Sequence, residues 1–312
     1  MIEGADARTS RIRQDTPAAQ EGLHLDVVPL IRDYVSLTKP RIISLLLLTT
    51  VATMFVAEPS GPPLSTILWT MLGGYLAAGG AGAINHYIDR NRDARMSRTS
   101  KRPLANGRIE PLHGLIFGIT LGVLSFFQLW LTTNLLAAVL AMVGLLGYVF
   151  LYTLWLKPLT PQNIVIGGSA GAVPPLVGWA AASGGLTWDA FWPFAIIFFW
   201  TPPHFWALSL MIKDDYAKTG VPMLPVVKGE AETRRQILIY TIFMVGFTVG
   251  PTCTGLLGPL YLFSSIALGA VYVGFSFALW RNPSPGIILK AYLYSLAYLA
   301  LLFVAMAVDA VS

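Results

Sequence analysis

The first side chains that could do chemistry are an amide and two carboxylates spaced four residues apart: Asn85, Asp89 and Asp93. At a helical twist they share one face within about 80° and extend along roughly 12 Å, so they can converge like metal ligands. They stand where a long apolar segment, residues 66–88, meets a strongly basic one. Ionisable groups at the end of a membrane helix usually face a cavity and have a function, because contact with hydrocarbon is costly.

The oxygen atoms of this motif suit Mg²⁺, which typically takes one or two carboxylates and completes its shell with water and substrate phosphates. Cations that could hold phosphate oxygens follow closely, namely Arg98, Lys101, Arg102 and Arg108. A second acidic pair, Asp214 and Asp215, is flanked by Lys213 and Lys218. One such loop alone would be interpreted as solvated surface. Two loops that carry acids and cations, both beside apolar helices, predict a site that binds the diphosphate group of a ligand with a long apolar tail.

The composition indicates which elements must position these groups. Hydrophobic residues make up 55% of the 312 residues, charged residues make up 12%, and the mean hydropathy is +0.63. These values are typical of a polytopic membrane protein, in which each spanning helix needs about 20 apolar residues. The sequence predicts an all-α fold of nine such helices around a central cavity, at residues 42–58, 66–88, 113–131, 134–155, 163–182, 188–211, 236–256, 259–280 and 287–308.

The 21 Lys and Arg residues indicate the orientation, because on this map all of them lie before the first helix, in connections on the N-terminal side or, for Lys290, in the first turn of the ninth helix on that same side. The positive-inside rule then predicts a cytoplasmic N-terminus and a C-terminus on the opposite side. We expect residues 1–24 to form a disordered cytoplasmic tail and residues 25–312 a transmembrane domain, with active-site loops at 89–112 and 213–235. A bacterial cytoplasmic (inner) membrane is the simplest compartment. Basic residues confined to membrane loops argue against a nucleic-acid partner.

Several blocks of sequence resemble a known family. NHYIDRNRD at 85–93 is similar to the NxxxDxxxD signature of the UbiA-type intramembrane prenyltransferases, nine-helix enzymes that use Mg²⁺ and an isoprenyl diphosphate. Longer stretches resemble one subfamily of these enzymes, the protohaem IX farnesyltransferases or haem O synthases. They are TKPRI at 38–42, DARMSRTSKRPLANGRI at 93–109, YTLWLKPLTPQNIVIGGSAGAVPPLVGW at 152–179 and TPPHFWALSLMIKDDYAKTGVPMLPV at 201–226. The first motif alone identifies the superfamily, whereas the combined blocks are specific for the subfamily.

The resemblance implies roles for individual residues. Asn85, Asp89 and Asp93 would hold a first Mg²⁺, and Asp215 with Asp214 a second. Many members carry a second DxxxD motif, whereas Lys218 and Thr219 stand four residues after these two aspartates, so the second metal site could be divided differently. Diphosphate oxygens would bind Arg98, Lys101, Arg102 and Lys157, and the implied catalytic set is Asp89, Asp93, Asp215 and Lys101.

The implied reaction transfers the farnesyl group of farnesyl diphosphate to a vinyl group of haem b and gives haem O. Haem is then a substrate and Mg²⁺ the cofactor, with membrane lipid around the protein and a haem A synthase as a possible recipient of the product. Two alternatives stay open. The same fold could prenylate a quinone precursor or a chlorin, or the chain could be a cation-coupled transporter. Polar residues gathered on one face of the membrane argue against transport.

Histidines, one tyrosine and the single cysteine need separate interpretation. His204 and Tyr152 are expected in the haem or prenyl pocket, with a polar helix contact and an interfacial aromatic as the respective alternatives. His86 is expected beside the metal ligands or in a loop contact, and His113 and His24 in solvent. Cys253 is expected to be a small core residue. The Gly- and Pro-rich residues 167–178 predict close helix packing through small side chains.

Overall fold

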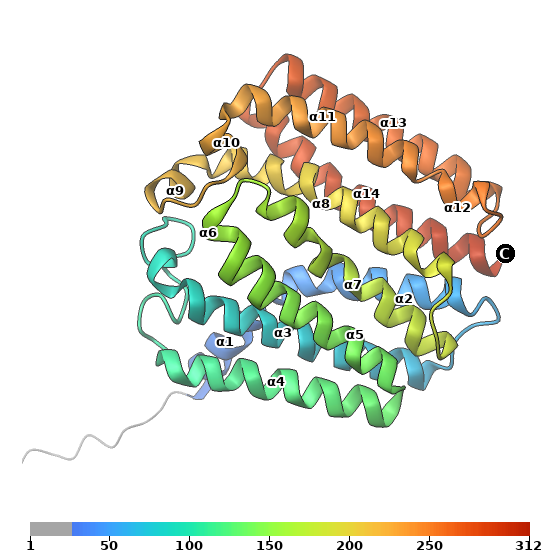
Figure 1. Cartoon of the computed structure of the whole chain (residues 1–312), viewed down its shortest axis with the longest axis horizontal. Helices are drawn as coiled ribbons and strands as arrows, with labels where there is room; N and C mark the ends of the chain where they lie inside the picture. The colour runs from blue at the N-terminus through green and yellow to red at the C-terminus, as the bar shows by residue number, and fades with distance from the viewer. Residues whose placement is uncertain (1–26) are drawn as a thin grey trace, which may run out of the picture.

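The computed structural model describes residues 27–312, which form helices and contain no strand (Figure 1). The predicted tail at residues 1–24 and His24 lie outside the described residues. A first helix that the sequence did not predict, α1 (Val27–Thr38), precedes the predicted bundle. It is amphipathic, with apolar residues such as Val28 and Ile31 exposed.

Nine helices in the described part of the chain are long and apolar enough to span a membrane, which confirms the predicted all-α fold. Four are single helices, α2 (Pro40–Ala57), α3 (Leu64–Asp93), α4 (Pro111–Thr132) and α7 (Asn163–Ser183). Two more close the chain, α13 (Pro259–Arg281) and α14 (Pro285–Val311). The other three are composite: α5 (Leu135–Leu146) with the π-helix η1 (Gly147–Leu156) and α6 (Lys157–Leu159), η2 (Trp188–Ala190) with α8 (Phe191–Met211), and α11 (Gly229–Phe247) with α12 (Gly250–Cys253).

Two helices begin or end in segments predicted as loops. α3 continues to Asp93, with Arg90 and Arg92 in its last turn, and α11 begins at Gly229, with Glu230 and Glu232 in its first turn. Cations near a helix C-terminus and anions near an N-terminus interact favourably with the helix dipole. Hydropathy alone could not place these ends because the polar turns lie beyond the apolar core of each helix.

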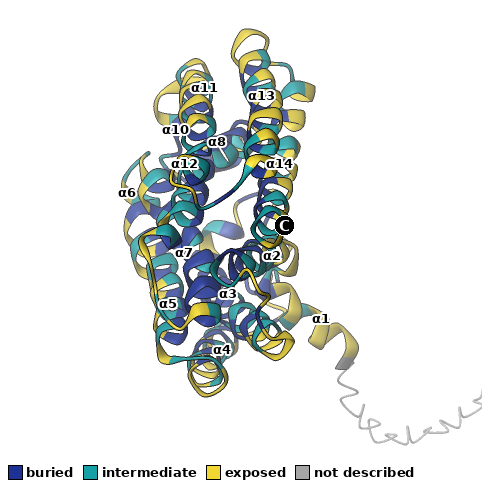
Figure 2. Cartoon of the chain, turned by 90° about the vertical axis from the view of Figure 1, so that its right-hand side faces the viewer, coloured by how far each residue is buried: buried dark blue, intermediate teal, exposed yellow. Residues whose placement is uncertain are grey.

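Both polar connections lie at the same end of the bundle. Figure 1 shows the connection after α3 on the same side as α6, α9 (Lys213–Lys218) and α10 (Leu224–Val227), with the C-terminus at the far end. Figure 2 shows buried residues concentrated on the inward sides of α2, α3 and α7. Large apolar side chains are exposed on the outside, including Leu131, Phe150 and Phe263. Such a surface suits contact with lipid tails.

Small residues bring α7 close to its neighbours, as predicted for residues 167–178. A Cβ atom at Gly178 would lie 2.2 Å from the backbone oxygen of Thr50 on α2, and one at Gly167 would lie 2.5 Å from the Tyr152 ring. Of the most apolar stretch of α7, 72% is buried, so this helix is central. Pro174 and Pro175 lie inside it. Close helix–helix contact therefore depends on the absence of side chains here.

Gly178 offers a direct test of this packing. We expect Gly178→Ala to lower the melting temperature in detergent, because the added methyl group would collide with backbone that cannot move aside cheaply. Gly274→Ala on α13 is the matched control, since a Cβ there meets nothing within 4 Å and alanine has the higher helix propensity. Equal melting temperatures for the two variants in a thermal unfolding assay would contradict the proposed contact.

Cys253 is exposed at the end of α12, so the expectation of a small core residue is wrong. The four-residue helix buries Pro251 and turns the thiol outward. His113 is exposed as expected, with 62% of its side chain accessible.

Candidate active site

The last turns of α3 bury the amide and both carboxylates of the first motif. Asn85, Asp89 and Asp93 are only 4%, 1% and 4% exposed. The Asn85 amide nitrogen donates to Asp89 Oδ2 at 2.9 Å and to Thr153 Oγ1 at 3.2 Å, and its oxygen accepts from Lys39 Nζ at 2.8 Å. Because both ends of the amide are engaged, its orientation is fixed and the Asp89 carboxylate is held beside it.

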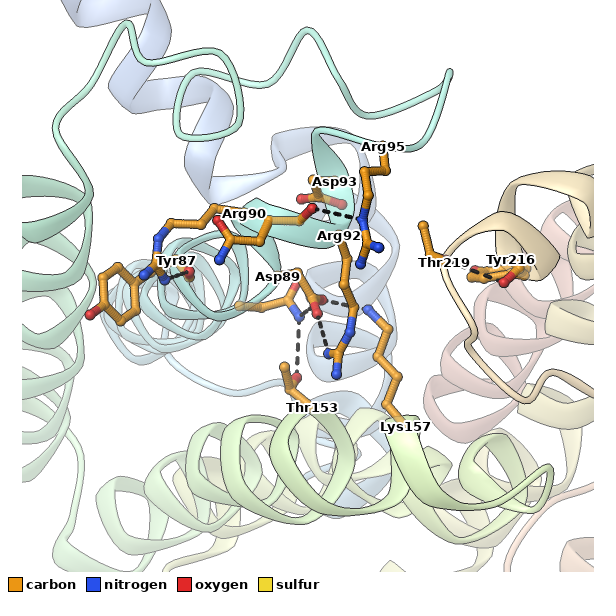
Figure 3. Close-up of polar contacts among 12 residues, drawn as sticks. Tyr87, Asp89, Arg90, Arg92, Asp93, Arg95, Thr153, Lys157, Tyr216 and Thr219 are labelled. Carbon is orange, nitrogen blue, oxygen red and sulfur yellow. Dashed lines mark hydrogen bonds and ion pairs between the residues drawn. The ribbon is translucent and has the colours of Figure 1, made fainter.

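Two cations offset the buried charge of Asp89 (Figure 3). Lys157 Nζ contacts Oδ2, and Arg92 Nη1 lies 3.2 Å from Oδ1. Lys157 is the first residue of α6, directly after the π-helical stretch that also carries Thr153. A carboxylate this deeply buried would be costly without such partners. The predicted diphosphate ligand Lys157 and the predicted metal ligand Asp89 are therefore direct neighbours.

Asp93 is held by the connection that follows α3. Arg102 Nη1 lies 2.7 Å from Asp93 Oδ2, and the Thr99 hydroxyl donates to the Asp93 backbone oxygen at 3.1 Å. The connection thus folds back over the end of the helix. A second predicted pair of metal ligand and phosphate ligand, Asp93 and Arg102, is brought together in this way.

Asp215 joins the two polar connections, which are more than a hundred residues apart in sequence. Its carboxylate accepts from the Ser97 hydroxyl at 3.0 and 2.8 Å, from the Ser97 amide at 3.2 Å and from the Arg98 amide at 3.3 Å. These hydrogen bonds, above all that from the Ser97 hydroxyl, lower the pKa of the Asp215 carboxyl. Asp214, by contrast, is exposed. The two aspartates are therefore not equivalent, and only Asp215 faces the first connection.

The donor set fits Mg²⁺ by its chemistry, because Asn85, Asp89, Asp93 and Asp215 offer hard oxygen atoms and no sulfur or imidazole ligand. The four are not gathered around one point. No group of three or more His, Cys, Asp or Glu side chains in residues 27–312 converges as it would around a metal ion. Fewer protein ligands are enough for Mg²⁺ when water and substrate phosphates supply the rest. Asn85, Asp89 and Asp93 would hold one ion, and Asp215 would contribute separately.

Two cavities adjoin this region. One is apolar, has a volume of about 240 Å³ and lies between α2, α3, α5 and α7, with Leu46, Thr50, Gly74, Ala77, Gly171 and Val177 in its wall. The other has a volume of about 720 Å³ and is strongly basic. Its wall includes Arg32, Lys39, Arg98, Lys101, Arg102 and Arg108, with Asp33 as its one acid. The predicted phosphate ligands of the first connection therefore share one cavity.

His86 lies in the wall of the basic cavity, about one helical turn before Asp89. It is 3% exposed, and neither ring nitrogen has a hydrogen-bond partner.

His204 and Tyr152 occupy other positions than the wall of either cavity. The His204 ring stacks on Trp200 at 4.2 Å and on Tyr292 at 5.0 Å between centroids, and its Nδ1 lies 2.6 Å from Ser295 Oγ. The contacts with Tyr292 and Ser295 join α8 to α14, as in the alternative interpretation of a polar helix contact. Tyr152 is buried, with 9% of its surface exposed, and its ring centroid lies 5.4 Å from that of Tyr148. Tyr148 itself lines the apolar cavity.

Four residues of the site were not singled out from the sequence: Lys39, Arg92, Ser97 and Thr153. Arg92 is three residues from Asp89, a spacing that brings side chains together on a helix, so that pair could have been found. Ser97 reaches Asp215 and Thr153 reaches Asn85 only through tertiary folding, and no local pattern marks them.

Nine spanning helices with buried acids at one end define a multi-pass integral membrane protein whose polar site opens near an apolar cavity. Solved structures share this fold. One described as digeranylgeranylglyceryl phosphate synthase is 17% identical with a TM-score of 0.73, covering 90% of this chain and 98% of that chain. Another, a UbiA homolog from Archaeoglobus fulgidus bound to DMAPP and Mg²⁺, is 16% identical with a TM-score of 0.63, covering 88% and 99%.

Sequence comparison places the chain more narrowly. The model of the UbiA prenyltransferase family matches residues 46–306, and the chain belongs to this family. A protein of Roseiflexus sp. (strain RS-1) named Protoheme IX farnesyltransferase is 53% identical over 282 residues, which is 90% of this chain and 53% of that relative. One of the same name from Symbiobacterium thermophilum is 51% identical over 90% of this chain and 94% of the relative. The chain thus spans about half the length of some relatives and nearly all of others.

Proposed function

We propose that this protein transfers the farnesyl group of farnesyl diphosphate to a vinyl group of haem b, giving haem O and diphosphate. The observation that carries the proposal is the 51% identity to the Symbiobacterium relative named Protoheme IX farnesyltransferase, 94% of which the chain covers. The site supports it independently, because buried acids alternate with basic side chains at the end of a bundle that encloses an apolar cavity. An allylic diphosphate combines the charge and the apolar chain that such a site would hold.

Separate groups of residues would bind the metal ions and the diphosphate. Mg²⁺, when held by Asn85, Asp89 and Asp93 with Asp215 at a second position, would supply positive charge to the diphosphate. Arg98, Lys101, Arg102 and Lys157 would bind its outer oxygens and stabilise the negative charge that grows on the leaving group. As the bond between C1 and oxygen breaks, its electron pair leaves with the diphosphate. The terminal vinyl carbon then bonds to C1, water adds to the cation formed beside the porphyrin, and that water loses a proton.

We also propose where the protein lies and which enzyme receives its product. The protein would lie in the bacterial cytoplasmic membrane with its N-terminus and polar connections in the cytoplasm, and it would pass haem O to a haem A synthase. An assay distinguishes this function from the alternatives, which are a quinone precursor or a chlorin as acceptor and cation-coupled transport. Purified protein incubated with haem b, farnesyl diphosphate and Mg²⁺ should yield a porphyrin heavier by one farnesyl group and one hydroxyl group in mass spectrometry.

Two control reactions sharpen this experiment. An aromatic acid in place of haem b should give no prenylated product, and proteoliposomes should show no ion flux in the absence of diphosphate release. Prenylation of the aromatic acid with unchanged haem b would overturn the choice of acceptor. Flux without diphosphate release would overturn the assignment as a transferase.

Gly74 tests whether the prenyl chain lies in the apolar cavity. A Cβ at Gly74 would come 3.2 Å from Leu47 Cδ2, so Gly74→Leu should shorten the cavity with modest local repacking. We expect kcat/KM for farnesyl diphosphate to fall at least about tenfold, and that for geranyl diphosphate to change little, since the shorter chain ends before the added side chain. Equal losses with both substrates in parallel kinetic assays would contradict this placement.

A further inference from the structure

Lys39 has an unusual backbone for a non-glycine residue. It joins α1 to α2 with φ 59° and ψ 56°, and it alone among the non-glycine residues of the described chain has positive φ. A side chain in this left-handed region costs of order 1–3 kcal/mol, and it persists where the surrounding structure over-determines it, often at functional sites. Pro40 follows and begins α2. The backbone at Lys39 is therefore strained, and the surrounding structure holds the lysine in this position.

The Lys39 side chain is half-buried beside the first acidic motif. Nζ donates to Asn85 Oδ1 at 2.8 Å and lies 5.8 Å from the centre of the Tyr148 ring. An ammonium group has three N–H donors and no acceptor, so donors besides the one given to Asn85 can serve an anionic oxygen. Lys39 therefore has both the position and the donors to bind an anion.

Lys39 is also where the two cavities meet. It contributes to the wall of the apolar cavity and to the wall of the basic cavity. The other five cations of the basic cavity, Arg32, Arg98, Lys101, Arg102 and Arg108, do not line the apolar one. A ligand with a charged head in one cavity and an apolar chain in the other must therefore pass Lys39 at the junction of head and chain.

We propose that Lys39 binds the oxygen that joins C1 of the prenyl chain to the diphosphate. This inference rests on the proposed use of a prenyl diphosphate. The N–H group donates a hydrogen bond to that oxygen as the C1–O bond breaks and the electron pair moves to the diphosphate, and Lys39 keeps its proton. The contact strengthens as charge develops, so it favours the transition state over the bound substrate. Its position fixes C1 at the boundary between the cavities.

The backbone provides a way to separate the ammonium from the strained conformation. Lys39→Gly removes the side chain and adopts positive φ without penalty, whereas Lys39→Ala loses the ammonium and keeps the strain. Arg41→Met is the matched control, because Arg41 is an exposed cation two residues away that lines neither cavity. We expect Lys39→Gly to melt no lower than the wild type and to lose about a hundredfold in kcat, with Arg41→Met unchanged.

A binding measurement completes the test without turnover. We expect Lys39→Gly to bind farnesyl diphosphate, supplied without haem b so that no transfer occurs, at least about tenfold more weakly than the wild type. A kcat within threefold of the wild type in Lys39→Gly would overturn the inference even if the wild type makes haem O. If the wild type makes no haem O but Lys39→Gly still weakens the binding of farnesyl diphosphate, the proposed acceptor fails and the inference stands. A wild type that does not bind farnesyl diphosphate would overturn both.

Discussion

Replacing Asp89 by asparagine should lower kcat by about a thousandfold or more while the protein still inserts and purifies as the wild type does. Asparagine keeps the size of the side chain and its neighbour Asn85, but it removes the charge against which Lys157 and Arg92 are placed. The loss should appear in kcat and also in Mg²⁺ dependence, because a neutral amide is a poorer ligand for a hard cation. Steady-state haem O formation across a Mg²⁺ titration measures both effects.

Glu232→Gln is the control for Asp89→Asn. Glu232 is a carboxylate in the first turn of α11, and Arg235 and Gln236 contact it on the protein surface. Its neutralisation should leave kcat and the Mg²⁺ dependence unchanged. Activity of Asp89→Asn within a few-fold of wild type would refute the metal role, and Asp93→Asn should behave as Asp89→Asn does.

Asp215→Ala should produce the second largest loss, about a hundredfold or more in kcat. The substitution removes a candidate metal ligand and at the same time releases the connection after α3, since the carboxylate accepts three kinds of hydrogen bond from Ser97 and Arg98. We therefore expect both a lower kcat and a higher KM for farnesyl diphosphate. Steady-state kinetics with each substrate varied in turn would measure the two effects.

Ser97→Ala separates the two roles of Asp215. It removes the hydroxyl that bonds to the carboxylate and leaves the carboxylate in place, so it should raise KM by a small factor with little change in kcat. Asp214→Ala is the matched aspartate control, because Asp214 is exposed. A loss in Asp214→Ala equal to that in Asp215→Ala would contradict the unequal roles that we assign to the pair.

The fold could be predicted from the sequence because the lipid bilayer places a simple requirement on every spanning helix. Each spanning helix must be apolar over about 20 residues, so segments such as 66–88 and 259–280 stand out without knowledge of their neighbours. This requirement did not predict the polar ends of helices such as α3 and α11. It did not predict the amphipathic helix α1 either, because only one face of that helix is apolar. Side-chain periodicity, rather than mean hydropathy, marks such a helix.

The site was predictable where its residues are close in sequence. Asn85 and Asp89 are one helical turn apart and do contact each other. The contact between Asp215 and Ser97 depends on how two distant connections dock, and the strained backbone of Lys39 stands where α1, packed against α3, gives way to α2. For His204 the sequence left two interpretations open, a pocket residue or a polar helix contact, and the structure adds a contact with Ser295 of α14 that no local pattern marks.

The π-helical stretch η1 has a consequence for how this chain tolerates change. A residue turns an α-helix by about 100°, whereas a π-helix spaces its hydrogen bonds one residue further apart and so alters which side each later residue faces. Thr153 lies within η1 and contacts Asn85 of α3, and Lys157 directly follows η1 and contacts Asp89 of α3. A variant shortened by a single residue here would retain the same lysine and aim it elsewhere, so the length of η1 matters for the contact with Asp89 as much as the lysine itself does.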